Sequence, residues 1–331
     1  MRQLVSDGLC TRRLTSTEAD AILRSAGVLP NAPQWREFLK RLFMYTGALA
    51  CAIGVVFFFA FNWQELPRFA KFALLQGGVV IAAAYAWRRG PDQIVGQAAL
   101  LGAMLLCGAL LAYLGQTYQT GADTFQLFLA WAVLILPWAI AARLGAAWAL
   151  WLVLVNLAVL LYFGRMSSNP LEIFFEVYGG HLLLFWLNLV VLLVAEWTLR
   201  ASSLSAASRL FPRFAGVLVL ACAGPGLVGL IVDVDVDDHH WLLMVSRLAM
   251  LATIVGFLFF YRRRHDMVML AATLLASIII ATFMVWRVFR HFGGDELGGI
   301  LMLGLFLICS SAAAAAWLRV TQRQWQQGAL S

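Results

Sequence analysis

Residues 115–124 form a dense group of polar side chains between two apolar stretches. They read Gly-Gln-Thr-Tyr-Gln-Thr-Gly-Ala-Asp-Thr, with amides, hydroxyls and one carboxylate but no basic residue. The preceding turn, 62–67, adds further donors and acceptors. Because helices joined by short loops are usually neighbours, we expect the two turns to share the mouth of one pocket. The candidate ligand-binding residues are Asn62, Trp63, Gln116, Tyr118, Gln119 and Asp123, together with Arg247. Alternatively, these side chains only satisfy irregular backbone at the membrane edge.

Arg247 is a single cation inside an otherwise apolar stretch. It follows Trp241 by six residues, which places it about 9 Å below the membrane surface at the helical rise. A buried guanidinium needs a partner or a path to water. We expect it to pair with Asp237, Asp238, Asp295, Glu296 or a ligand carboxylate, and the alternative is that it extends to the lipid headgroups.

The segment 233–240 is a weak metal-site candidate. It reads Asp-Val-Asp-Val-Asp-Asp-His-His. The alternating Asp residues are similar to the start of a calcium loop, but Asp238 replaces the required Gly and Met244 the required Glu, so it is no EF-hand. Carboxylates and imidazoles still suit a divalent transition metal, whereas acidic loops without metal are also ordinary. The candidate ligands are Asp233, Asp235, Asp237, His239 and His240.

No pattern in the chain indicates catalysis. There is no nucleophile paired with a base, no phosphate-binding loop and no pair of metal ligands within one apolar stretch. No Asp, Glu, His or Lys lies at the centre of a stretch, which disfavours a proton relay. We therefore expect no cofactor and no enzymatic activity.

The elements that must position these residues are membrane-spanning helices. Hydrophobic residues make up 62% of the 331 and charged residues only 12%, against about 25% charged in soluble domains. Ten apolar stretches are each long enough to cross a hydrocarbon core of about 30 Å as a helix. The sequence thus predicts an all-α, polytopic membrane bundle. The predicted spans are 42–61, 68–87, 94–114, 125–142, 145–163, 180–198, 214–232, 241–261, 267–286 and 298–318.

The Lys and Arg residues predict the orientation of these spans. With a cytoplasmic amino terminus, 18 of them fall in inner segments and 5 in outer segments. This excess on one side predicts that both termini are cytoplasmic and that the candidate ligand residues open to the outer face. The net charge of +7 is distributed at the ends of spans, which favours lipid headgroups and not nucleic acid as the partner.

Short polar segments precede the first span. Thr15-Ser-Thr-Glu18 is a capping box that predicts the start of a helix. A second helix is expected to start at Asn31, either lying on the membrane surface or forming a soluble hairpin. The chain is divided into a cytoplasmic segment 1–41, membrane halves 42–145 and 146–318, and a tail 319–331.

Two further patterns concern the interior. Asn156 and Asn188 each place an amide near the middle of a span, where it most simply bonds a neighbouring helix. The second and seventh spans are interrupted by Gly77-Gly78 and by 224–226, Gly-Pro-Gly. Paired interruptions indicate the midplane site of an inverted-repeat transporter, and the alternative is kinks and close packing.

Several of these stretches carry a family resemblance. The stretches Ala26-Gly-Val-Leu-Pro30, Phe59-Ala-Phe-Asn-Trp63, Lys71-Phe72 and Gly115-Gln-Thr-Tyr-Gln-Thr-Gly-Ala-Asp123, followed by Trp131 and Pro137, resemble the bacterial membrane-protein family called domain of unknown function 2157, DUF2157. The resemblance covers about residues 15 to 145. It implies a multi-pass protein of the bacterial inner membrane, and by itself no activity, substrate or cofactor.

Two functions remain open from the sequence. The first is a transporter or ligand sensor with a polar site at the outer face, whose partners are membrane lipids and a small polar ligand. The second is a non-catalytic membrane scaffold or assembly protein. A continuous polar cavity from the outer loops to the bilayer centre favours the first, and a sealed bundle favours the second.

Overall fold

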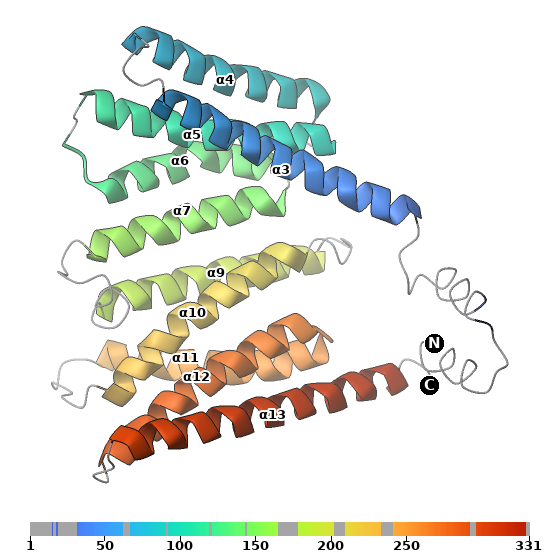
Figure 1. The fold of residues 1–331 in the computed structure, drawn as a ribbon, viewed down its shortest axis with the longest axis vertical. Helices are drawn as coiled ribbons and strands as arrows, with labels where there is room; N and C mark the ends of the chain where they lie inside the picture. The colour runs from blue at the N-terminus through green and yellow to red at the C-terminus, as the bar shows by residue number, and fades with distance from the viewer. Residues whose placement is uncertain are drawn as a thin grey trace. The chain divides into compact units, whose positions relative to one another are not determined.

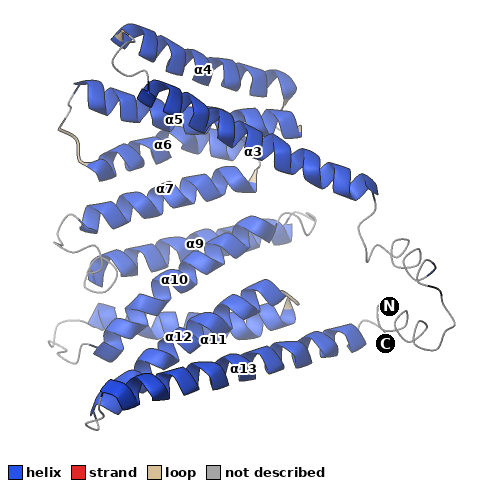
Figure 2. Cartoon of the chain, in the orientation of Figure 1, coloured by secondary structure: helices blue, strands red, loops and turns tan. Residues whose placement is uncertain are grey.

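A computed structural model describes residues 15, 18, 32–61, 67–90, 92–118, 121–142, 144–164, 178–201, 209–232, 241–291 and 296–328. Long α-helices account for nearly all of these residues, and no strand occurs among them (Figure 2). Labelled as in Figure 1, the helices are α3 (Ala32–Phe61), α4 (Arg68–Arg89), α5 (Ile94–Tyr118), α6 (Thr124–Ala142), α7 (Gly145–Gly164), α9 (Tyr178–Ala201), α10 (Leu210–Val232), α11 (Trp241–Arg263), α12 (Met267–His291) and α13 (Glu296–Gly328).

Each predicted span corresponds to one of these helices. All ten are long and apolar enough to cross a membrane, so the predicted all-α, polytopic fold is confirmed. The helix ends differ most at α3, which begins at Ala32 and continues unbroken through the first span, and at α13, which continues to Gly328. The helix predicted to start at Asn31 is thus present from Ala32, continuous with the first span, and its position on the membrane surface stays a prediction. Polar helix formers such as Arg36 and Lys40 continue the helix beyond the apolar stretch, because leaving the hydrocarbon does not end a helix.

The predicted capping box at Thr15 is confirmed. The Thr15 backbone N–H and hydroxyl donate to Glu18 Oε2 at 2.8 and 2.7 Å, and the Glu18 N–H donates to Thr15 Oγ1 at 3.4 Å. The first of these bonds contributes most to lowering the pKa of the exposed Glu18 carboxyl. Such reciprocal bonds satisfy N–H groups that have no partner within a helix.

The structure consists of two compact units. The first comprises residues 1–118 with 141–143, and the second residues 119–140 with 144–331. In the first unit, α3 and α4 both pack on α5 (Figure 1). Leu75 and Tyr113 are its buried centre between α4 and α5. The predicted boundary at 145/146 follows the extent of the family resemblance, and it stays a prediction.

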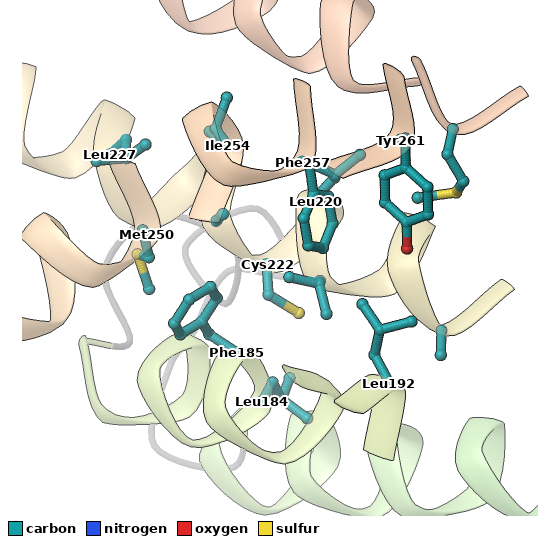
Figure 3. Packing of buried hydrophobic residues seen from close by; sticks show 14 of the residues in the cluster. Leu184, Phe185, Leu192, Leu220, Cys222, Leu227, Met250, Ile254, Phe257 and Tyr261 are labelled. Carbon is teal, nitrogen blue, oxygen red and sulfur yellow. The ribbon is translucent and has the colours of Figure 1, made fainter. Parts of the chain in front are cut away.

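Helix α10 is the centre of the second unit. It packs against α7, α9, α11 and α12, and α13 packs on α12. In the most apolar part of each helix, half of the residues of α10 are buried, against 6% of those of α13. Figure 3 shows Phe185 of α9, Cys222 of α10 and Met250 of α11 meeting in this core. Small residues allow the backbones of neighbouring helices to approach closely. Close packing matters here because helices in a membrane gain little stability from the release of water.

The glycine interruptions do not break their helices. Both α4 and α10 continue through Gly77-Gly78 and through residues 224–226. A methyl group added at Gly226 would lie 2.7 Å from the sulfur of Met250. Close packing, the alternative interpretation of the pattern, thus accounts for Gly226.

Candidate functional site

The structure describes four of the candidate ligand residues. Gln116 and Tyr118 lie exposed in the last turn of α5, in the first unit. Asp123 precedes α6 and Arg247 lies in α11, both in the second unit. Their predicted meeting in one cavity stays a prediction. The remaining candidates lie outside the described residues: Asn62, Trp63, Gln119, Asp233, Asp235, Asp237, His239 and His240.

Aromatic rings close the predicted outer end of the first unit. The ring of Phe72 lies 4.6 Å from Tyr113 and 6.0 Å from Tyr118, measured between centroids. The Tyr113 hydroxyl donates to the backbone carbonyl of Arg68 at 3.2 Å. These contacts fix the start of α4 against the end of α5. Tyr118 is 64% exposed, so its hydroxyl end is available beyond this packed base.

Lys71 is a buried cation at the same end, and it is not among the site residues predicted from the sequence. Only 4% of Lys71 is exposed, although it lies within one turn of the amino terminus of α4. That turn contains no acidic residue, and Pro67 provides no side-chain cap. Lys71 has an interaction within the protein, and the positive end of the helix dipole adds to the positive potential at this end of α4. An ionisable residue buried in a spanning helix is the available sequence signal for such a site.

Asp123 caps α6. Its backbone N–H donates to Gln126 Oε1 at 3.2 Å, and its carbonyl accepts the Gln126 N–H at 2.9 Å. Gly121 supplies a left-handed residue with φ of +65° just before it. Asp123 thus begins a helix three residues ahead of a Gln, which is a capping arrangement.

Arg247 is half-buried in α11. Among the residues that the structure describes, no carboxylate pairs with it. The side chains of its predicted partners lie outside the described part of the chain: Asp237, Asp238, Asp295 and Glu296. The pairing of Arg247 stays a prediction.

Asn156 and Asn188 form a closed amide pair in the interior of the second unit. Asn188 Nδ2 donates to Asn156 Oδ1 at 2.7 Å, and Asn156 Nδ2 donates to Asn188 Oδ1 at 3.0 Å. Each Nδ2 also donates to the carbonyl four residues earlier, that of Leu152 or Leu184, at 2.8 Å. The predicted bond between helices is confirmed, and it joins α7 to α9. Both donors of each amide are used, so little hydrogen-bonding capacity is left for a ligand.

A second polar cluster surrounds the short turn between α11 and α12. Arg213 Nε donates to Asp266 Oδ2 at 2.9 Å, and the Asp266 side chain is only 3% exposed. Arg264 lies 3.9 Å from a carboxylate oxygen of Glu196 in α9. The guanidinium of Arg262 lies 5.6 Å from the ring centroid of Trp317 in α13. These contacts tie α9, α10 and α13 to one turn, and sequence spacing gives no signal for them.

His265 turns the chain at this cluster. Its φ is +55°, and the next N–H, that of Asp266, donates to the Tyr261 carbonyl at 3.1 Å. Asp266 Oδ1 then accepts the Met269 N–H at 3.3 Å, which caps α12. One helix ends in a Schellman motif and the next begins within the same turn. The cluster has the geometry of a structural clamp, because its groups are paired with one another.

These observations define the class of the protein: a helical membrane protein that crosses the bilayer many times. Among the described residues, no group of three or more His, Cys, Asp or Glu side chains is placed to hold a metal ion. Residues 9–148 match the family model described as "Predicted membrane protein (DUF2157)". The resemblance predicted from the Gly-Gln-Thr-Tyr-Gln stretch is thus confirmed for the amino-terminal part of the chain. No curated protein and no solved structure is significantly similar to the chain.

Proposed function

We propose that this protein is a non-catalytic scaffold of the bacterial inner membrane, with both termini in the cytoplasm. The observation that carries the proposal is the closed Asn156–Asn188 pair in the interior of the second unit. A solute path needs polar groups that are free to exchange partners with a solute. Here the amides are committed to each other and to backbone, as in an element that fixes the packing of helices.

The packing around the amide pair supports the same function. Asn188 contacts Cys222 of the buried core cluster, in which Leu152, Phe185 and Met250 are fully buried. The helices α4 and α10 are continuous, whereas transporters of the inverted-repeat type bind substrate at broken helices. A protein of this kind acts through the surfaces that it offers to other molecules.

Ligand sensing at the predicted outer end of the first unit is the second candidate. The buried Lys71 favours it, because an ionisable residue buried in a spanning helix marks a candidate functional site. A thermal-shift screen of the purified protein against polar anions tests this candidate. Stabilisation that the Lys71→Gln variant loses would favour sensing.

The accessibility of Cys222 tests the scaffold proposal. Its sulfur lies 3.7 Å from Asn188 Nδ2, inside the packed core. In a variant that keeps Cys222 and replaces the other four cysteines with alanine, we expect a membrane-impermeant thiol reagent added to either side to react very slowly. The expected rate is about 100-fold or more below that of a cysteine at the exposed position 263, because reaction must wait for the core to open.

Two controls keep this measurement interpretable. Full labelling of Cys222 after denaturation in detergent would show that the thiol itself is reactive. Labelling in intact membranes at a rate similar to that of position 263 would mean that water reaches the core, and transport would then replace the scaffold proposal.

A further inference from the structure

The first unit contains an apolar groove between α3, α4 and α5. It has a volume of about 380 Å³, within the range of about 300–1,000 Å³ that is usual for small-molecule sites. Gly47 and Cys51 of α3, Ala82 and Tyr85 of α4 and Gly102 of α5 contribute to its walls. All of its lining residues belong to segments that are apolar enough to span the membrane. A polar solute would find almost no hydrogen-bonding partner there, whereas a hydrocarbon chain needs none and would be in contact with apolar walls.

Basic residues gather at one end of this groove. The chain direction places the start of α3, the end of α4 and the start of α5 at the same end of the unit, because successive helices run in opposite directions (Figure 1). The cations at this end are Arg36, Lys40, Arg41, Arg88 and Arg89, against the two carboxylates Glu37 and Asp92. Arg41 and Glu37 pair with each other at 3.0 Å, so the remaining charge is positive.

The groove and the charge are in direct contact. The guanidinium of Arg89 lies 5.3 Å from the ring centroid of Tyr85, and Tyr85 lines the groove. At the same end, the Tyr45 hydroxyl donates to Gln97 Oε1 at 3.0 Å and ties α3 to α5. A molecule that lies in the groove thus meets the Arg89 guanidinium at the end of the apolar lining.

We propose that this groove binds one acyl chain of an anionic phospholipid, whose phosphate lies at Arg88 and Arg89. A hydrocarbon chain matches the apolar walls, and the phosphate matches the excess of positive charge. A second copy of the chain is a poorer occupant. Two copies in one membrane meet with the same ends together, which would place their basic ends side by side and make them repel each other.

Native mass spectrometry of the purified full chain with added lipids tests the proposal. We expect phosphatidylglycerol to bind about tenfold or more tightly than phosphatidylcholine with the same acyl chains, because only the former has a net negative headgroup. Gly102→Leu should reduce this binding at least about tenfold, since a side chain added at Gly102 meets no atom within 4 Å and enters the groove. Gly115→Leu is the matched control, because Gly115 lies in the same helix outside the groove and is equally unobstructed.

The charged part of the site has its own test. The double substitution Arg88→Gln and Arg89→Gln should bring the affinities for the two lipids close to each other while the acyl chain still binds. Equal affinities in the unmodified protein, or unchanged binding in Gly102→Leu, would overturn the proposal. Loss of a dimer in Gly102→Leu without loss of lipid would assign the groove to a second copy.

A photo-reactive lipid provides a measurement that needs no variant. Phosphatidylglycerol with a diazirine in its acyl chain should cross-link to peptides that contain Gly47–Val55 and Ala98–Leu106 several-fold more than to α13, whose apolar surface is highly exposed. Cross-links spread over all exposed apolar helices in proportion to their surface would indicate ordinary surrounding lipid and would contradict the proposal.

Discussion

Replacing Asp266 with alanine should destabilise the protein by about 2–4 kcal/mol. The substitution leaves the Arg213 guanidinium without its carboxylate, and breaking a buried pair costs about 3–5 kcal/mol. Arg213 is about one third exposed, so solvent lowers this cost, and the loss of the α12 cap adds about 1 kcal/mol. The free energy of unfolding in detergent measures the effect.

An ion pair of equal length but different burial is the matched control. Glu37 and Arg41 are 3.0 Å apart and both about half exposed, so Glu37→Ala should cost less than about 0.5 kcal/mol. Asp266→Asn keeps an N-cap residue and loses the charge, and it should be intermediate. Equal stability of the Asp266→Ala and Glu37→Ala variants would contradict the role assigned to the buried pair.

Replacing Gly96 with alanine should have the second largest effect, a loss of about 2 kcal/mol or more. A methyl group at Gly96 would overlap the carbonyl oxygen of Gly90, which is backbone and cannot rotate away. Gly90 itself has φ of +80° and donates its N–H to the Ala86 carbonyl at 2.9 Å. The turn between α4 and α5 would have to open, and with it the packing of the first unit. Thermal unfolding in detergent measures this loss.

Gly102→Ala is the control for Gly96→Ala. It lies in the same helix, and a methyl group there meets no atom within 4 Å. Because alanine is the better helix former by about 1 kcal/mol, this variant should be as stable as the original protein or more so. If the Gly96→Ala and Gly102→Ala variants had the same melting temperature, the turn would relax without cost in stability, which would contradict the prediction.

Hydropathy predicted the ten spans because each apolar stretch matches the thickness of the bilayer. It could not predict where α3 begins or where α13 ends, since polar residues such as Arg36 and Gln324 remain helical outside the apolar stretch. The bond between Asn156 and Asn188 was predictable in kind, because an amide within a span must find a partner. Which helix supplies that partner follows from the packing around α10.

The candidate site was less predictable than the fold. The density of amides and hydroxyls near Gln116 predicts a ligand site that stays a prediction, and the Asp123 N–H next to it is bonded to the Gln126 side chain at the start of α6. Lys71 lies inside a predicted span, which is a signal for a site, but its burial depends on the packing of α4 on α5 and cannot be seen in the sequence. The pair of Arg213 with Asp266 joins residues 53 positions apart, and such contacts depend on tertiary packing that local spacing does not encode.

The number of membrane crossings is the claim on which the sites and the proposed function depend. Among the residues that the structure describes, five helices long and apolar enough to span, α6, α7, α9, α10 and α11, lie between Ala122 and Arg263, so we expect these two exposed positions on opposite sides of the membrane. Single cysteines at these positions, in a background without other cysteines, test this directly in intact cells. We predict that an impermeant thiol reagent added outside labels Ala122→Cys and leaves Arg263→Cys unlabelled. Labelling of both positions from one side would contradict the ten crossings, and labelling of Arg263→Cys alone would reverse the orientation.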